Sequence, residues 1–227
     1  MLIIWQSLKW ISTMKKNIII FLIVIIFTLL LSYTDIVVYI ENTHNLSELN
    51  LNDTELEEYI NEQCIITDDK EIYKTICNTF CNTLSFTARK EFYKRGWKII
   101  TTDKPIFSDD ENITVGRTSL RNKTIVIYSK NDILKETLKH ELLHYCIYLY
   151  QYKINYLITK DLNDIYKEEK NNLILDTDYD TNYAKSNVYE YYCNIYGCNS
   201  INNTNTPKSQ LIIKKILSKV NHFAIIK

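Results

Sequence analysis

The sequence predicts a mixed α/β (α+β) domain that has a small sheet and one long central helix, and that follows an N-terminal transmembrane or signal helix. Three observations lead to this prediction. Apolar residues recur at helical spacing in several segments after residue 70, short runs rich in β-branched residues lie near the middle of the chain, and a long apolar run lies near its start. We therefore divide the chain into an N-terminal anchor or signal peptide (1–40), an acidic stalk (41–69) and a folded domain (70–227).

The composition excludes several functional classes. The chain has 27 basic and 27 acidic residues and no basic block or Gly-rich phosphate loop, so we expect no nucleic-acid partner. Only three Gly and two Pro occur, which excludes flexible linkers and collagen-like segments. With 227 residues, the chain has room for one or two domains.

The apolar run spans Ile18 to Leu31 and is broken only by Thr28. Such a run is typical of a secretory signal or a membrane anchor, and we favour an uncleaved anchor because the residues after it form a poor cleavage site. Lys15 and Lys16 precede the run, whereas residues 41–60 carry six acidic groups and no Lys or Arg. The positive-inside rule then predicts a cell-membrane protein with an extracellular domain, or a secreted protein if the segment is cleaved.

Local patterns predict the elements that follow. Gly96 is placed to end a helix before a strand-like run. We expect helices over 72–84, 87–95, 161–171, 185–196 and 211–220, strands over 97–101, 113–116 and 124–128, and loops over 105–112 and 176–181.

The segment from Thr137 to Cys146 contains a His140-Glu141-x-x-His144 motif within a pattern typical of a buried helix. Side chains four residues apart lie on the same helix face, so both imidazoles can bind one Zn²⁺. Glu141 is then placed beside the open metal position, where it can take a proton from a water whose pKa the metal lowers to about 7. We therefore predict one catalytic Zn²⁺ per chain, with Glu141 as the general base.

A catalytic zinc needs a third protein ligand. A His that follows a glycine bend is absent, because Ile147 and Tyr150 occupy the two positions. Other acids either lie in the loop at 176–181 or among Lys and Asn residues that indicate a solvated face: Asp176, Asp178, Asp180, Glu168 and Glu169. Glu190 is the only acid in the aromatic and apolar segment 187–196, where an unpaired carboxylate is costly to bury. We assign Glu190 as the third ligand.

The segment from Tyr183 to Tyr196 resembles the third-ligand segment of the anthrax lethal factor catalytic domain and of the related secreted Pro-Pro endopeptidases. The likeness extends over roughly residues 70–225 and includes residues 96–100, 115–116, 123–127, the motif helix and 207–208. The resemblance implies a zincin-like metalloprotease domain over 70–227 that hydrolyses peptide bonds in a peptide or protein substrate.

The resemblance also implies roles for two further residues. Tyr183, seven residues before Glu190, is expected to point its hydroxyl at the site and to stabilise the tetrahedral intermediate. Where the family often has a second Glu, one turn after the ligand, this chain has Asn194, which can still form a hydrogen bond around the site.

Six cysteines, in a domain expected outside the cytoplasm, allow up to three disulfides, and the sequence does not choose among the pairings. A structural metal site formed by Cys77, Cys81, Cys193 and Cys198 is a weaker alternative. For Cys146 and Cys193, a place in the apolar core is at least as plausible as a bridge.

Two functions of different classes are consistent with these patterns. The first is a membrane-anchored or secreted zinc endopeptidase, which the presence of Glu141 and Tyr183 favours. The second is a catalytically silent domain of the same fold that binds a peptide or protein.

Overall fold

The computed structural model describes residues 2–107, 113–130, 132–155, 157–174, 178–197 and 206–222, and the chain divides into unit 1 (1–48) and unit 2 (49–227). The side chains of residues 2–17, 27–32, 153 and 178–180 are outside this description. Most of the predicted loop at 105–112 lies outside the described residues. So do the first two residues of the predicted loop at 176–181.

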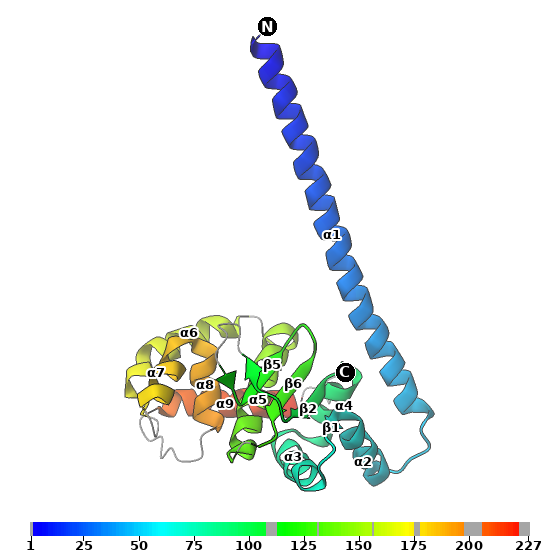
Figure 1. Cartoon of the computed structure of the whole chain (residues 1–227), viewed down its shortest axis with the longest axis vertical. Coiled ribbons are helices and arrows are strands. Elements are labelled where there is room, and N and C mark those ends of the chain that lie inside the picture. Colours follow the sequence, from blue (N-terminus) through cyan, green and yellow to red (C-terminus); the bar gives the residue numbers. More distant parts are fainter. Residues whose placement is uncertain are drawn as a thin grey trace. The chain divides into compact units, whose positions relative to one another are not determined.

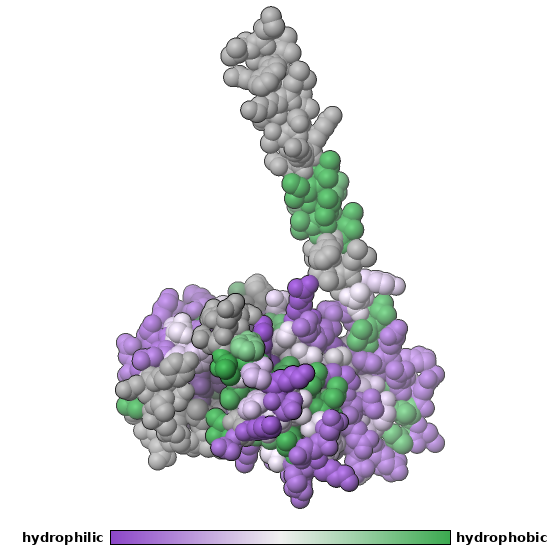
Figure 2. Space-filling view, in the orientation of Figure 1, coloured by the Kyte–Doolittle hydropathy of each residue, from purple (hydrophilic) through white to green (hydrophobic). Residues whose placement is uncertain are grey.

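Unit 1 is the helix α1 (Leu2–Glu48). Its apolar side chains from Ile18 to Ile26 are exposed, and they form the green band on this helix in Figure 2. Among the helical residues that the structure describes, no stretch is both long enough and apolar enough to span a membrane.

Residues 53–66, which the sequence analysis assigned to the second half of the stalk, are part of unit 2. They form α2 (Asp53–Cys64), which Asn52 and Glu55 begin with a capping box, and the short strand β1 (Ile65–Ile66). Ile60 and Cys64 are fully buried. The acidic residues of α2 lie on its solvent-facing side. They gave the segment the composition of a solvated stalk, although its apolar residues face the core.

A buried arginine fixes α2 to the next two helices, α3 (Lys70–Thr83) and α4 (Phe86–Lys94). The Arg89 side chain is 3% exposed, donates hydrogen bonds to the main-chain oxygens of Cys81 (3.3 Å) and Leu84 (2.6 Å), and forms an ion pair with Glu57 of α2. One guanidinium thus satisfies carbonyls at the end of α3 that have no partner within the helix.

The main sheet has the strand order β1-β2-β6-β5, formed by β1, β2 (Lys98–Thr102), β6 (Thr124–Tyr128) and β5 (Gly116–Ser119). The first three strands are parallel, and β5 runs antiparallel to β6 at the edge. Ile99 pairs with Ile125 at its centre, and both are fully buried. The predicted strands at 97–101 and 124–128 are confirmed to within one residue. The predicted strand at 113–116 divides into β4 (Ile113–Thr114), which pairs with β3 (Ile106–Phe107), and the start of β5.

The remaining helices are α5 (Leu134–Lys153), α6 (Ile158–Glu169), the 3₁₀ turn η1 (Lys170–Asn172), α7 (Asp178–Ser186), α8 (Val188–Gly197) and α9 (Pro207–His222). Figure 1 shows α6, α7 and α8 gathered on one side of unit 2 and α2, α3 and α4 on the other, with the sheet and α5 between them. The expected α+β class is therefore observed: a helix-rich unit with a small mixed sheet.

Two predicted boundaries near residue 187 are wrong. Residues 178–181, expected in a loop, begin α7, and the helix expected over 185–196 is interrupted at Asn187. The Asn187 side chain accepts a hydrogen bond from the Tyr189 main-chain N–H at 2.8 Å, which is the usual contact of a helix N-cap. Because of this cap, a new helix, α8, starts at Val188, two residues before Glu190.

The helix α9 is held at both ends by residues that are distant in the sequence. At its start, the buried Glu169 carboxylate accepts hydrogen bonds from the Lys208 N–H (3.0 Å), the Ser209 N–H (2.9 Å) and the Ser209 hydroxyl (2.7 Å). At its end, the Asn221 side chain accepts from the Ser85 N–H, and the Ser85 hydroxyl donates to the Asn221 main-chain oxygen, both at 2.8 Å. These contacts fix α9 to the end of α6 and to the start of α4.

Candidate metal centre

The helix α5 carries His140, Glu141 and His144 through the middle of unit 2. It is covered by apolar contacts on most sides, since Leu138, Leu142 and Tyr145 are fully buried. This burial fixes the rotation of the helix, and the polar face that remains is directed at α8 and β5. The motif residues therefore lie between these two elements and not on a solvated helix face.

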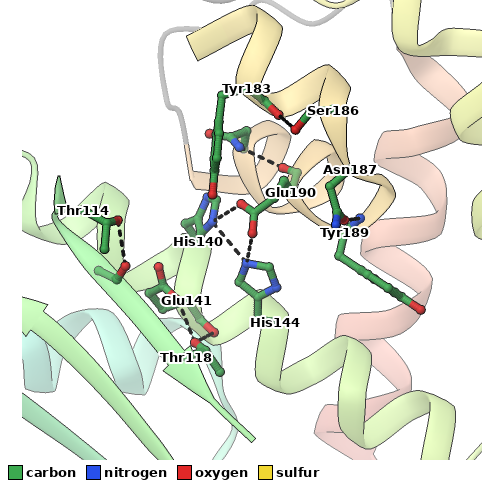
Figure 3. Close-up of polar contacts among 12 residues, drawn as sticks. Thr114, Thr118, His140, Glu141, His144, Tyr183, Ser186, Asn187, Tyr189 and Glu190 are labelled. Atoms are coloured by element: carbon green, nitrogen blue, oxygen red, sulfur yellow. Dashed lines mark hydrogen bonds and ion pairs between the residues drawn. The ribbon is translucent and has the colours of Figure 1, made fainter. Parts of the chain in front are cut away.

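His140, His144 and Glu190 converge on one point (Figure 3). The two Nε2 atoms of the histidines are 3.2 Å apart. The Glu190 carboxylate reaches both rings from α8, with Oε2 3.1 Å from Nε2 of His140 and Oε1 3.3 Å from Nε2 of His144. The structure thus brings together the three residues that the sequence assigned to the metal.

The donor atoms have the spacing that a tetrahedral zinc requires. Ligand atoms at about 2.0–2.1 Å from a metal, at tetrahedral angles, lie about 3.3 Å from one another. The two imidazole nitrogens are 3.2 Å apart, and each lies 3.1–3.3 Å from a different one of the two Glu190 oxygens. In addition, Oε2 of Glu190 is buried without a hydrogen-bond partner of acceptable geometry. A divalent cation at this point would satisfy that oxygen, so the residues present fit a Zn²⁺ ion.

The electrostatics of the cluster keep the carboxylate ionised. Burial alone would raise the pKa of Glu190, but its contacts with His140 and His144 hold that pKa well below its usual value. Burial alone would likewise lower the pKa of His144, but its interactions with Cys193 and Glu190 raise that pKa well above 6.5. In the absence of a cation, the proton on His144 therefore neutralises Glu190, and a bound metal would replace it.

Cys193 is a second potential third ligand in this cluster. Its sulfur and one ligand atom each of His140 and His144 all lie within 4.8 Å of one another. We prefer Glu190, because its oxygens have the closer spacing and because burial raises the pKa of the Cys193 thiol to about 11. At neutral pH the carboxylate is the anionic donor that is already present.

Glu141 is held by the edge strand β5. Its side chain is 6% exposed, and the Thr118 hydroxyl lies 2.7 Å from its Oε2 and 3.1 Å from its main-chain oxygen. Gly116 makes room for this carboxylate, because a Cβ there would be 2.8 Å from Oε1 of Glu141 and 2.6 Å from the Thr137 methyl. The strand thus both orients the side chain and leaves it space.

Tyr183 lies on α7 and is 48% exposed. In Figure 3 its ring extends from α7 toward His140, with the hydroxyl at the near end. The Asn194 amide donates to the main-chain oxygen of Glu190 at 2.8 Å, one turn earlier in α8. Asn194 therefore supports Glu190 through a hydrogen bond to its main chain, and not through a hydrogen bond to one of the histidine rings.

Sequence reasoning missed three residues that shape the site: Thr118, Gly116 and Gly197. A Cβ on Gly197 would be 3.0 Å from the Glu136 main-chain oxygen and 3.0 Å from Cβ of His140, so this glycine permits the close approach of α8 to α5. The chain has only three glycines, and two of them contact the motif helix. This scarcity was the signal in the sequence that could have pointed to Gly116 and Gly197.

Of the other candidates from the sequence, the two that the structure describes, Glu168 and Glu169, contact the start of α9. Glu169 is buried, which corrects the solvated face predicted for it, but it caps α9. Asp176 lies outside the described residues, and so do the side chains of Asp178 and Asp180.

The cysteines give no second metal site in the part of the chain that the structure describes. The one group of three or more potential ligands found there contains Cys193, and Cys77 and Cys81 are not part of it. The five described cysteines carry free thiols, and Cys198 lies outside the described residues.

Comparison of the sequence with protein-family models and with curated proteins gave no match. The geometry of the site and the resemblance of the motifs are therefore the basis for assigning a function.

Proposed function

We propose that this chain is a zinc-dependent endopeptidase with a zincin-like fold, of the type that resembles the lethal factor and Pro-Pro endopeptidase catalytic domains. The observation that supports it best is the convergence of His140, His144 and Glu190 at 3.1–3.3 Å, around a buried carboxylate oxygen without a hydrogen-bond partner. A zinc ion bound there would polarise the scissile carbonyl and acidify the attacking water.

The side chains around this point have distinct roles in the proposed reaction. Glu141 takes the proton of the attacking water and later delivers it to the leaving amine, while Thr118 holds its Oε2 in place. The Tyr183 hydroxyl donates a hydrogen bond to the oxygen that becomes negative in the transition state. The carboxylate of Glu190 orients both imidazoles and would neutralise part of the charge of a bound metal.

The experiment compares three variants of the full chain with the wild type, using metal content and hydrolysis of a broad peptide library. Glu141→Gln keeps size and polarity but cannot accept a proton, so zinc should stay bound while hydrolysis falls about 10²-fold or more. Tyr183→Phe should lower kcat about 10²- to 10³-fold with little change in KM. Glu190→Ala should lose zinc and activity together.

Glu136→Gln is the matched control, because it makes the same chemical change on the same helix, five residues before Glu141. It should retain both zinc and activity. Zinc-loaded wild type that hydrolyses no peptide in the library would reject the enzyme and favour the competing hypothesis of a silent peptide-binding domain. Full hydrolysis by Glu141→Gln would assign the general base to another group.

We also propose that unit 2 acts outside the cytoplasm, attached through the apolar segment of residues 1–40 unless that segment is cleaved. Support comes from the charge asymmetry around the segment, with Lys15 and Lys16 before it and six acids in residues 41–60. Protease added outside intact cells should digest or release unit 2. Full protection of unit 2 would reverse the proposed orientation.

A further inference from the structure

The helix α9 has two sides of different character, and the core of unit 2 uses only one of them. On the buried side lie Ile212, Ile213, Ile216 and Val220. The other side, here called the lysine face, consists of exposed residues: Lys208, Leu211, Lys214, Lys215, Ser218, Lys219 and His222. It contains no acidic residue, and its one leucine is 70% exposed. The proposed reaction gives this face no role.

Four residues of the lysine face form one row along the helix. Lys208, Leu211, Lys215 and Lys219 follow one another at spacings of three and four residues, so they lie one above the other. Like charges one turn apart repel each other, so the row is unfavourable unless an anion lies near it. Lys208 has such a partner in Glu168. Within the part of the chain that the structure describes, the other lysines of the face form no ion pair.

The charge of the lysine face differs from that of the whole chain, which has 27 basic and 27 acidic residues. Residues 191–227 contain five lysines and no Asp or Glu, whereas residues 41–69 contain nine acidic residues and no Lys or Arg. Solvated surfaces usually mix both signs of charge. The lysine face is therefore a local excess of positive charge, and it attracts an anionic partner.

The shape of the face favours an extended anionic surface over a small anion. Side chains on the outer side of a helix point away from one another, so these lysines cannot enclose one phosphate. Their ammonium groups can each contact a different headgroup of a lipid layer. Leu211 lies within the row, and an exposed apolar side chain fits the boundary between headgroups and acyl chains.

We propose that the lysine face of α9 binds the anionic headgroups of the membrane to which residues 1–40 attach the chain. The inference rests on the attachment proposed above, because an attached domain meets the lipid surface at a high effective concentration. The contact is mainly electrostatic, since the apolar side of α9 is used by the core. It holds unit 2 at the lipid surface.

The first test uses the full chain in lipid nanodiscs, whose two faces are both open to solvent. The discs contain phosphatidylcholine alone or phosphatidylcholine mixed with phosphatidylglycerol. Acetic anhydride, an uncharged reagent, acetylates exposed lysines, and mass spectrometry gives the rate at each position. A lysine near an anionic surface strengthens binding about fivefold, so three unpaired lysines should favour the bound state about 10²-fold. Acetylation of Lys215 and Lys219 should then be at least about 10-fold slower on the anionic discs.

Lys74 of α3 and Lys160 of α6 are internal controls, because they are exposed lysines on other helices. Their acetylation should be equally fast on both kinds of disc. Salt at about 1 M, which screens charges beyond about 3 Å, should restore fast acetylation of Lys215 and Lys219. Equal rates at these two lysines on both kinds of disc, or equal slowing at the control lysines, would overturn the proposal.

The second test reverses one charge of the face and keeps Lys215 and Lys219 as reporters. Lys214→Glu places a carboxylate that has no lysine three or four residues away, so it cannot pair along the helix. It should remove most of the protection of the two reporters on anionic discs. Lys74→Glu is the matched control, because it makes the same change at an exposed position of α3, and it should keep that protection. An equal loss in both variants would reduce the effect to net charge and overturn the proposal.

These outcomes are separable from failure of the proposed attachment, which coelution of the chain with the discs measures. A chain that coelutes with both kinds of disc without protection of Lys215 and Lys219 keeps the attachment and overturns the inference. A chain that coelutes with anionic discs alone, with both lysines protected, rejects the apolar anchor and supports the inference. Equal protection by soluble polyglutamate would identify an acidic peptide as the partner and overturn the lipid assignment. The assay needs neither zinc nor hydrolysis, so failure of the proposed enzyme leaves it intact.

Discussion

Glu169 and Glu168 are adjacent residues at the end of α6 and provide a test of how the domain is held together. Glu169 is 4% exposed, and its carboxylate accepts three hydrogen bonds from Lys208 and Ser209 at the start of α9. Glu168 is exposed and forms only an ion pair with the Lys208 side chain. Each can be changed to Ala. The two variants differ in the number of buried hydrogen-bond donors that lose their acceptor.

The size of the effect follows from these contacts. A hydrogen bond to a charged group contributes about 1.5–3 kcal/mol, so three bonds set an upper limit of about 5–9 kcal/mol. Two of the three donors belong to Ser209, and contributions of neighbouring groups do not add, so we expect Glu169→Ala to lower the free energy of unfolding by about 3–5 kcal/mol. An exposed ion pair contributes about 0–1 kcal/mol, which is the loss expected for Glu168→Ala.

Thermal unfolding followed by circular dichroism measures this difference. In a domain of this size, 1 kcal/mol corresponds to about 2–4 °C in Tm, so Glu169→Ala should lower Tm by about 6–20 °C and Glu168→Ala by less than about 4 °C. Below its Tm, Glu169→Ala should still bind one zinc. Equal Tm losses in the two variants would refute the capping role, and loss of zinc by folded Glu169→Ala would return this residue to the list of ligands.

Three further predictions address the site and the boundary of the domain. Gly116→Ala places a methyl against the Glu141 carboxylate and should lower kcat by about 10²-fold without loss of zinc. Steady-state kinetics and metal analysis measure the two effects. An unchanged kcat would mean that β5 moves to make room for the methyl. In the metal-free protein, Cys193 and Glu190 raise the pKa of His144 above 6.5 despite its burial, so this contribution to stability is complete below about pH 6.5 and is lost as the pH rises through the folded-state value. Denaturant unfolding should therefore show lower stability at pH 9 than at pH 6, and Glu190→Gln should flatten this dependence. Removal of residues 1–69 takes away α2 and β1 and should leave the remainder unfolded by circular dichroism, whereas removal of unit 1 alone should leave it folded; a folded 70–227 fragment would restore the predicted stalk.

The elements whose composition is uniform over several residues could be predicted from the sequence. The strands at 97–101 and 124–128 are runs rich in β-branched residues, and the motif helix lies in a largely apolar segment without Gly or Pro, so their positions followed from local composition alone. The break at Asn187 could not be predicted in this way, because the residues on both sides of it continue a helical pattern. A single side-chain cap was enough to start a new helix.

The site was predictable where its residues are chemically unusual in their surroundings. His140 and His144 are two of four histidines, and Glu190 is a lone acid among aromatic residues, so each stands out in the sequence. Thr118 is an ordinary residue whose role depends on Glu141, a neighbour that the fold brings close. The burial of Arg89 and Glu169 was hidden for a related reason, because charged residues are expected at the surface unless a partner is known.

The contacts at the two ends of α9 have a consequence for the order of events during synthesis. Ser85 is bonded to Asn221, 136 residues later, and Glu169 needs Ser209, so neither group has its partner while the chain is still being extended. The helices that carry the three proposed ligands, α5 and α8, both pack against α9. We therefore expect the three proposed ligands to reach their final spacing only after α9 has left the ribosome, so that any zinc loading would follow the synthesis of this helix. A chain that ends before residue 207 would contain all three proposed ligands but would lack the helix that packs against α5 and α8.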